Sequence, residues 1–132
     1  MRTAVIDHLA LNVSDVDRSL AFYQEMLGFD VERLAEFRGG KVSFPSIRVN
    51  PDTIIDLMSG PDLAKDGRHP LNHFAFRLAA GELELLHRRL AEHEVEIVEP
   101  PRPRWGARGT GLSMKVLDPD GNIVELKAAA ED

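Results

Sequence analysis

The stretch Asp7-His8-Leu9-Ala10-Leu11-Asn12-Val13 recurs in the middle of the chain as Asn72-His73-Phe74-Ala75-Phe76-Arg77-Leu78. After its first residue, each copy reads histidine, apolar, alanine, apolar, polar, apolar. A second pair of similar stretches follows, because Asp56 stands inside the apolar run Thr53–Met58 and Glu125 stands inside the run Asn122–Lys127. The pattern predicts a unit of about 65 residues used twice, beginning on a histidine strand and ending on a carboxylate strand.

Length and composition limit the classes of protein that this chain can represent. Its 132 residues, 43% of them hydrophobic, are enough for one domain with a real core. The net charge of −6 argues against nucleic acid as a partner, because nucleic-acid binding usually needs a basic surface. The absence of cysteine excludes disulfides and thiolate ligands. No apolar stretch is as long as that of a signal peptide or a membrane span, so we expect a cytoplasmic protein with no membrane partner.

The first unit has the periodicity of a β-α-β-β-β module. Val5–Val13 alternates like a strand, and a helix is predicted from Ser14 to Gly28 by the stripe Val16, Leu20, Tyr23 and Leu27. Three further strands are expected in this module, at Phe29–Glu36, Lys41–Val49 and Thr53–Met58, with Gly39-Gly40 as a hairpin turn between the first two.

The second unit repeats this order after a linker rich in Gly, Pro, Asp and Lys. The expected elements are a strand at Leu71–Leu78, a helix at Gly81–Glu92, a short strand at Val95–Glu99 stopped by Pro100-Pro101, and a hairpin of Leu112–Leu117 with Ile123–Lys127. We therefore predict one α+β domain over residues 1–132, with module 1 at about 1–58, the linker at 59–70 and module 2 at about 71–128.

Strand alternation places four polar side chains on one kind of face. His8, Asp56, His73 and Glu125 each lie opposite the strand face that packs on a helix. A buried carboxylate is costly, whereas a divalent cation satisfies it. Two imidazoles with one or two carboxylates suit Zn, Ni, Fe, Mn or Co, and coordination positions left for water are typical of a catalytic site.

A simpler interpretation exists for each of these residues alone, because strand histidines are usually hydrogen-bonded core or surface residues. Asp56 can equally pair with an arginine, and its short side chain can reach a metal through water. The repeat that places all four residues equivalently favours the metal site.

The chain resembles the vicinal oxygen chelate superfamily, which includes glyoxalase I, bleomycin-resistance proteins and extradiol dioxygenases. The resemblance rests on both histidine stretches, and on the motifs Ser19-Leu20-Ala21-Phe22-Tyr23, Leu27-Gly28-Phe29 and Asp118-Pro119-Asp120-Gly121-Asn122 followed by Glu125. It implies paired βαβββ modules that form a curved mixed-sheet cup with helices outside, a divalent metal ion in the cup, and a homodimer. In some members the cup joins modules from two protomers, so the site residues need not come from one chain.

The resemblance also assigns roles to residues. His8, His73 and Glu125 match the recurrent metal ligands, and Asp56 falls where glyoxalase I carries a glutamate ligand, so aspartate there is a departure. The implied chemistry is chelation of a small oxygen-rich substrate and stabilisation of an oxyanion or enediolate, as in lyases and isomerases. Glu125 or Asp56, or a metal-bound water, is the expected base.

Several other polar residues are candidates for contacting the substrate. Ser113 and Lys115 share one strand face, Arg77 lies on the face of His73, and Arg48 and Trp105 belong to segments that can reach the cup. Two alternative functions stay open. A non-haem Fe(II) extradiol-type dioxygenase uses two histidines and one carboxylate as well, and a metal-free module that sequesters a drug has the same fold.

Overall fold

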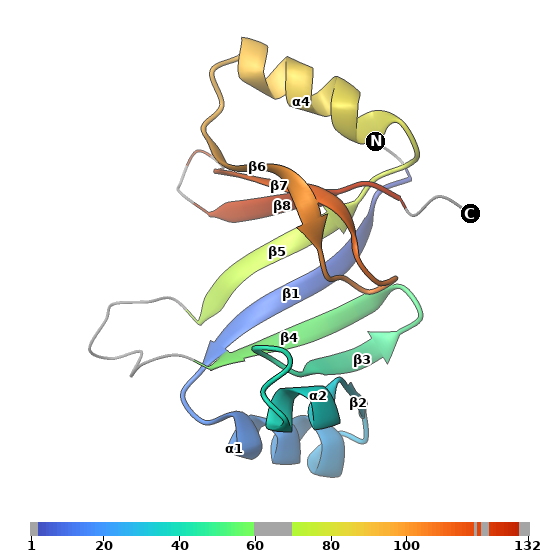
Figure 1. Ribbon diagram of the computed structural model, residues 1–132, viewed down its shortest axis with the longest axis vertical. Coiled ribbons are helices and arrows are strands. Elements are labelled where there is room, and N and C mark those ends of the chain that lie inside the picture. Colours follow the sequence, from blue (N-terminus) through green and yellow to red (C-terminus); the bar gives the residue numbers. More distant parts are fainter. Residues whose placement is uncertain (1–2, 60–69, 118, 120–121, 130–132) are drawn as a thin grey trace. The chain divides into compact units, whose positions relative to one another are not determined.

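The computed structural model describes residues 3–59, 70–117, 119 and 122–129. The first module contains strand β1 (Val5–Val13), helix α1 (Val16–Leu20), π-helix η1 (Ala21–Met26), β2 (Asp30–Glu32), helix α2 (Leu34–Arg38), β3 (Ser46–Asn50) and β4 (Thr53–Ser59). The second contains β5 (Leu71–Arg77), α4 (Glu82–Glu92), β6 (Ile97–Arg104), β7 (Gly111–Leu117) and β8 (Ile123–Lys127). Figure 1 shows these elements.

The strands form a mixed eight-stranded sheet in the order β2-β3-β4-β1-β5-β8-β7-β6. β1 pairs parallel with β4, and β5 pairs parallel with β8, while β2 with β3, β3 with β4, β6 with β7 and β7 with β8 are antiparallel. The order repeats in the two modules, and the predicted α+β class is confirmed. None of the described helices combines the length and apolar character that crossing a bilayer requires.

The chain divides into two compact units, His8–Asn72 and Met1–Asp7 with His73–Asp132. The start of β1 is therefore grouped with the second half of the sequence, which alternation alone did not indicate. The single-domain assignment stays a prediction, and residues 60–69 of the predicted linker lie outside the described residues.

In the unit His8–Asn72, period-2 alternation separates an apolar face from a polar one. Its core is made of four buried side chains, Val16, Leu20, Ile47 and Leu57. The opposite face of β1 and β4 carries His8, Ala10 and Asp56, because His8 pairs with Ile54 and Ala10 pairs with Asp56 in the parallel register. The polar residues of this face are thus supported from behind by a packed apolar layer.

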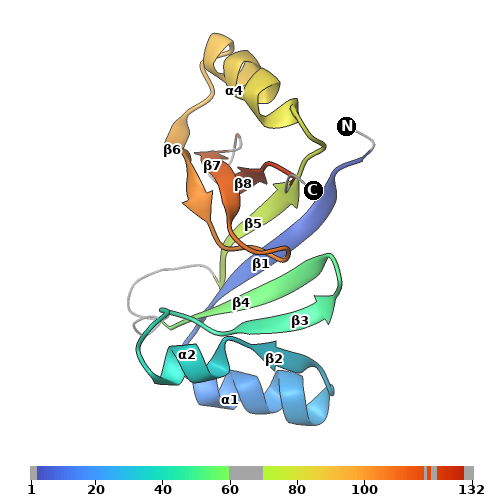
Figure 2. The ribbon, with the colours of Figure 1, turned by 45° about the vertical axis from the view of Figure 1, so that its right-hand side comes forward.

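The other unit repeats this arrangement around α4 (Figure 2). The α4 residue Leu83 packs with four other buried residues, Leu78, Met114, Val116 and Leu126. Because Met114 and Val116 face this core, Ser113 and Lys115 lie on the opposite face of β7. That face of β5, β7 and β8, which also carries His73, Arg77, Glu125 and Lys127, is called the polar face below.

The prediction of a hairpin between Phe29 and Val49 was wrong. Only Asp30–Glu32 and Ser46–Asn50 are strands, and α2 lies between them. Leu34 and Phe37, three residues apart, both pack against the core of this unit, which is helical rather than strand spacing. Gly40 ends this segment with φ of 77°, so the glycine pair terminates a helix instead of turning a hairpin.

Two other predicted boundaries also differ from the structure. The helix predicted for 14–28 becomes a π-helix after Leu20, and Leu27 is 52% exposed instead of buried. β6 does not stop at Pro100 but continues to Arg104. It does so because β6 is an edge strand with irregular register, where a residue without an N–H group is tolerated.

Candidate metal centre

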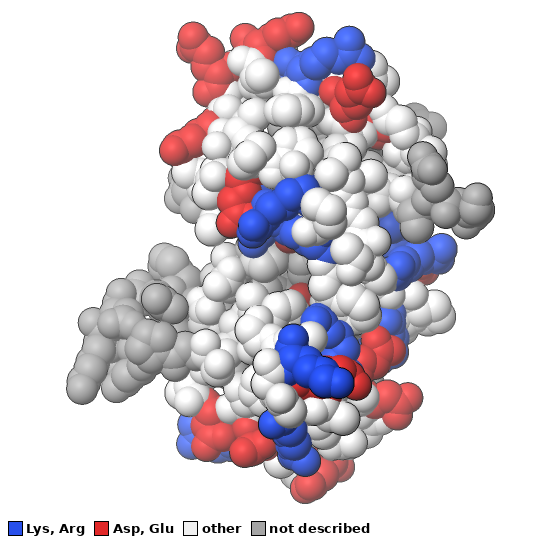
Figure 3. All heavy atoms as spheres, viewed as in Figure 1, with Lys and Arg blue, Asp and Glu red and all other residues white. Residues whose placement is uncertain are grey.

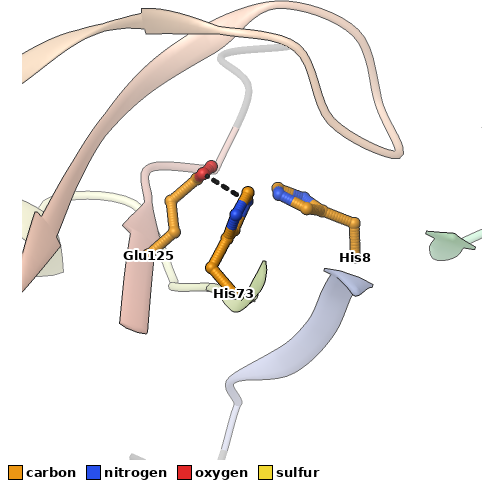
Figure 4. Close-up of side chains that lie close together, drawn as sticks. All are labelled: His8, His73 and Glu125. Atoms are coloured by element: carbon orange, nitrogen blue, oxygen red, sulfur yellow. Dashed lines mark ion pairs between the residues drawn. The ribbon is translucent and has the colours of Figure 1, made fainter. Parts of the chain in front are cut away.

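His73 and Glu125 come from neighbouring parallel strands of one unit. Ala75 pairs with Glu125 in the β5–β8 register, so His73, two residues earlier on β5, lies on the same face as Glu125. Both side chains are buried, and the imidazole Nε2 of His73 lies 3.3 Å from Oε1 of Glu125. Figure 4 shows the carboxylate of Glu125 directed at this imidazole.

His8 follows Asp7 directly in β1 and is only 1% exposed. Ala10, the next residue on the same strand face, is fully buried, and alanine has the smallest side chain of any residue except glycine. One ligand atom each from His8, His73 and Glu125 lie within 4.8 Å of one another, and Figure 4 shows the two imidazoles side by side. Within the described part of the chain, this is the group of side chains that offers three such atoms together.

The chemistry of these donors suits a divalent metal ion. Ligand atoms about 2.0–2.2 Å from an ion such as Zn²⁺ lie about 3–3.5 Å apart. The 3.3 Å separation of His73 Nε2 and Glu125 Oε1 is in that range. Two neutral imidazoles and one carboxylate leave further coordination positions open, as catalytic sites do. The residues present therefore fit the ion.

Asp56, the fourth predicted ligand, is buried on the polar side of β4 but is not a member of this group of three within the described residues. Its Oδ1 accepts a hydrogen bond of 2.6 Å from the hydroxyl of Ser46, which is its cross-strand partner on β3. This bond holds the carboxylate of Asp56 in one orientation. The sequence pattern gave no signal for Ser46.

Ser113 and Lys115 project from β7 toward the same side as Glu125. Lys115 is paired with Glu125 on β8 and with Glu99 on β6, so it lies between two carboxylates in the cross-strand register. Ser113 is fully buried, and its hydroxyl accepts a hydrogen bond of 3.2 Å from Arg104. Arg104 also donates a hydrogen bond to Glu99, which holds the pKa of Glu99 below its usual value.

Arg77 lies in a buried ion pair, which the sequence pattern did not reveal. Its Nη1 is 3.3 Å from Oδ1 of Asp7, and Oδ2 of Asp7 accepts a hydrogen bond of 3.1 Å from the backbone N–H of Ala107. Lys127, only 2% exposed, donates to the carbonyl oxygens of Arg104 and Gly111. The sequence offered one indication of this ion pair, because Asp7 stands at an otherwise apolar position in the alternation of Val5–Val13.

Arg48 and Trp105 are the remaining predicted substrate-contacting residues. Arg48 forms a bidentate ion pair with Glu32, at 2.8 and 3.0 Å, and these hydrogen bonds hold the pKa of Glu32 below its usual value. Trp105 is half-buried in the loop that follows β6. Neither residue belongs to the group of three ligand atoms.

The comparisons with known proteins agree with this architecture. The chain is 30% identical over 131 residues to the virulence protein STM3117 of Salmonella typhimurium, with 92% of this chain and 81% of that protein covered. It is 28% identical over 122 residues to the metallothiol transferase FosB of Shouchella clausii, with 92% and 77% covered.

A similar fold occurs in the Mn(II)-bound glyoxalase from Novosphingobium aromaticivorans. That structure has a TM-score of 0.71 at 15% identity, with 96% of this chain and 41% of that chain covered. The family model described as Glyoxalase/Bleomycin resistance protein/Dioxygenase superfamily matches residues 5–126. Since this match spans nearly the whole chain, the protein belongs to the glyoxalase/bleomycin resistance protein/dioxygenase superfamily.

Proposed function

We propose that this protein is a divalent-metal-dependent enzyme of the glyoxalase-like type, acting as a lyase or isomerase on a small oxygen-rich substrate. The observation that carries the proposal is the grouping of three buried ligand atoms, from His8, His73 and Glu125. Burying two imidazoles beside a carboxylate is costly without a cation, and these donors suit Zn, Ni, Fe, Mn or Co. The names of two relatives, a metallothiol transferase and a Mn(II)-bound glyoxalase, support a metal-dependent activity.

A bound cation supplies Lewis-acid stabilisation of negative charge on substrate oxygens. The residues of the chain then have separable tasks. His8, His73 and Glu125 hold the ion and exclude water from its buried side. Asp56 is our candidate for the base that accepts a substrate proton, because it is a buried carboxylate outside the ligand group and the hydrogen bond from Ser46 holds it in place. Glu125 is the second candidate base.

Other predicted residues are proposed to position the substrate, and the structure separates them by what they contact. Ser113 and Lys115 share the polar face with Glu125 and are our first candidates. Arg77 is held in an ion pair with Asp7, and Arg48 is held in an ion pair with Glu32. We therefore expect these two arginines to influence substrate binding through their charge and the shape of the site.

Metal content measured by elemental analysis tests the proposal. Purified protein is expected to bind one divalent ion, and His73→Ala is expected to lose it. His87→Ala is the matched control, because His87 lies on α4 outside the ligand group. Retention of the metal by His73→Ala would show that the assigned site is wrong.

A second candidate reaction follows from the same donor set. Two histidines and one carboxylate also form the facial triad of non-haem Fe(II) oxygenases. Oxygen consumption by the Fe(II)-loaded protein with catechols distinguishes a dioxygenase from a lyase or isomerase. A metal-free protein that instead binds a drug tightly would indicate a sequestering module of the bleomycin-resistance kind.

We also propose that the protein acts as a homodimer in the cytoplasm, on the resemblance of its sequence to dimeric members of the superfamily. Neither a nucleic-acid nor a membrane partner is proposed. Figure 3 shows acidic and basic side chains interspersed on one face, without a continuous basic surface there. Light scattering of the purified protein tests the dimer.

A further inference from the structure

The polar face carries more cationic than anionic side chains, although the chain has a net charge of −6. Its carboxylates, including those that reach it from β1 and β6, are Asp7, Glu99 and Glu125. Its cationic residues, with the two from β6, are Arg77, Arg102, Arg104, Lys115 and Lys127. A local excess of one sign in an oppositely charged protein attracts ligands of the other sign.

Four of these five cations have partners within the protein. Arg77 pairs with Asp7, and Lys127 donates to backbone carbonyl oxygens. Arg102 and Arg104 share the carboxylate of Glu99, and the side chain of Arg104 is only 9% exposed. The side chains of Arg77, Arg104 and Lys127 are therefore held in place by the fold, whereas the ion pair of Arg102 lies at the surface.

Lys115 differs from the other four. Among the described residues it forms no hydrogen bond or ion pair, and its charge acts on Glu99 only through space, where it helps to lower the pKa of that carboxyl. Lys115 is half-buried and stands directly across from Glu125 in the β7–β8 register. The Cα atoms of opposite residues on adjacent strands lie about 4.5–5.5 Å apart, so the side chain of Lys115 starts beside that of Glu125, one of the proposed metal ligands.

We propose that Lys115 binds a second acidic group of the substrate, a carboxylate or phosphate separate from the oxygens that chelate the metal. This inference rests on the proposed function and narrows the substrate class to chelating acids with an additional anionic group. A lysine on a flexible four-carbon stem is a compact point charge suited to either kind of anion. The fixed cations around it raise the local potential without competing for the same contact.

Three small acids with the same chelating end test the proposal on metal-loaded protein by calorimetry. 2-Hydroxyglutarate ends in a carboxylate, 2-hydroxypentanoate ends in a methyl group, and 2-hydroxy-4-phosphonobutanoate ends in a phosphonate. A charge-assisted contact at a half-buried site predicts binding of an acid-ended ligand about tenfold or more tighter than the methyl-ended one. The two acid-ended ligands show which anion is preferred.

The variants assign this preference to one residue. Lys115→Met is expected to lose the preference while keeping its metal and its affinity for 2-hydroxypentanoate. Lys115→Arg should retain the preference, and so should the control Lys41→Met, which changes an exposed lysine of the other unit. Thermal melting of each variant shows whether it is folded.

The possible failures are distinguishable. Equal affinity for all three acids in the metal-loaded wild type, including no measurable binding of any, would overturn the inference and leave the metal assignment standing. A preference that survives in Lys115→Met would overturn it as well. A protein that takes up no metal would remove the proposed function on which the inference rests.

Discussion

At the scale of single residues, Gly106 is confined more tightly than its sequence context suggests. A methyl group added at Gly106 would lie 2.7 Å from Cε of Lys127 and closer still to Oδ2 of Asp7. Both neighbours are buried and hydrogen-bonded, so neither can move aside at low cost. The loop that carries Trp105 is thus held against two buried charged side chains, those of Asp7 and Lys127.

Gly106→Ala is therefore expected to lower the free energy of unfolding by about 1–3 kcal/mol, the usual cost of overpacking. Gly111→Ala is a matched control, because its added methyl would meet nothing closer than 3.6 Å. Denaturant titrations measure both variants, and fluorescence of Trp105, the only tryptophan, reports whether the loop moves. Equal stability of the two variants would contradict the proposed confinement.

The candidate site stays a prediction at this scale, although the structure brings together ligand atoms of three of its proposed residues. His8, His73 and Glu125 were found because alternation and repetition act locally and reveal which strand face a residue occupies. Partners such as Ser46 depend on how strands pair across the sheet, and no local pattern contains the register. The same limit concealed the pairing of Asp7 with Arg77, two residues far apart in sequence.

At the scale of elements, the π-helix changes which residues reach the core. The Leu27 N–H bonds to the Phe22 carbonyl oxygen, five residues back, so this turn is wider than an α-helical one. A stripe counted at 3.6 residues per turn therefore predicts Tyr23 correctly, since Tyr23 packs against the core, but fails at Leu27. The resulting exposed surface includes Phe22, Met26 and Leu27.

Two leucine substitutions test this change of register. Leu20 is 4% exposed, so Leu20→Ala is expected to cost about 2–5 kcal/mol of unfolding free energy. Leu27 is 52% exposed, so Leu27→Ala is expected to cost less than about 1 kcal/mol. Urea unfolding monitored by circular dichroism compares them. Similar losses would mean that Leu27 packs as an ordinary α-helix would place it.

Side-chain hydrogen bonds from Arg104 supplement the backbone pairing of the edge strand β6 with β7. Arg104 donates to the carbonyl oxygen and the hydroxyl of Ser113, and also to the carboxylate of Glu99. Prolines at 100, 101 and 103 supply no backbone N–H groups, so these side-chain bonds replace part of the ladder.

The hydrogen bond from Arg104 to Glu99, both on β6, should make the stability of the protein depend on pH. The hydrogen bond from Arg104 lowers the pKa of Glu99 below 4.5, so its contribution to stability is full above pH 4.5 and is lost as the pH falls through the lower, folded-state pKa. Glu99→Gln should be less stable than wild type at neutral pH, and the gap should narrow below pH 4.5. Thermal melts across this range measure the gap, with Glu92→Gln, at the end of α4, as the control. A gap that does not change with pH would contradict this account.

At the scale of the whole molecule, the repeat predicted the fold class because each module alternates one apolar and one polar strand face. The apolar faces met the helices as expected. The prediction failed in the segment between β2 and β3, because the sequence alone does not show that Leu34 and Phe37 pack on the same core, and only that shared packing makes their spacing helical. Short amphipathic segments are ambiguous for this reason.

Occupation of the proposed site should stabilise the entire fold. A metal ion that binds only the folded chain, at about 100 times its dissociation constant, adds about 2.7 kcal/mol. For a domain of this size that corresponds to a rise of about 10 °C in Tm. Differential scanning fluorimetry with and without a chelator measures the rise, and His73→Ala should show none. An equal rise in that variant would place the ion elsewhere.

The grouping of Met1–Asp7 with His73–Asp132 has a consequence for cutting the chain. A break between the two sequence repeats would produce a C-terminal piece deprived of Asp7, and Arg77 and the Ala107 amide would lose their shared acceptor. Such halves are therefore interdependent, and a split protein would regain structure by fragment complementation rather than as two autonomous pieces. Because β1 contributes residues to both units, the two halves of a fused duplication can no longer be separated into independently folding proteins.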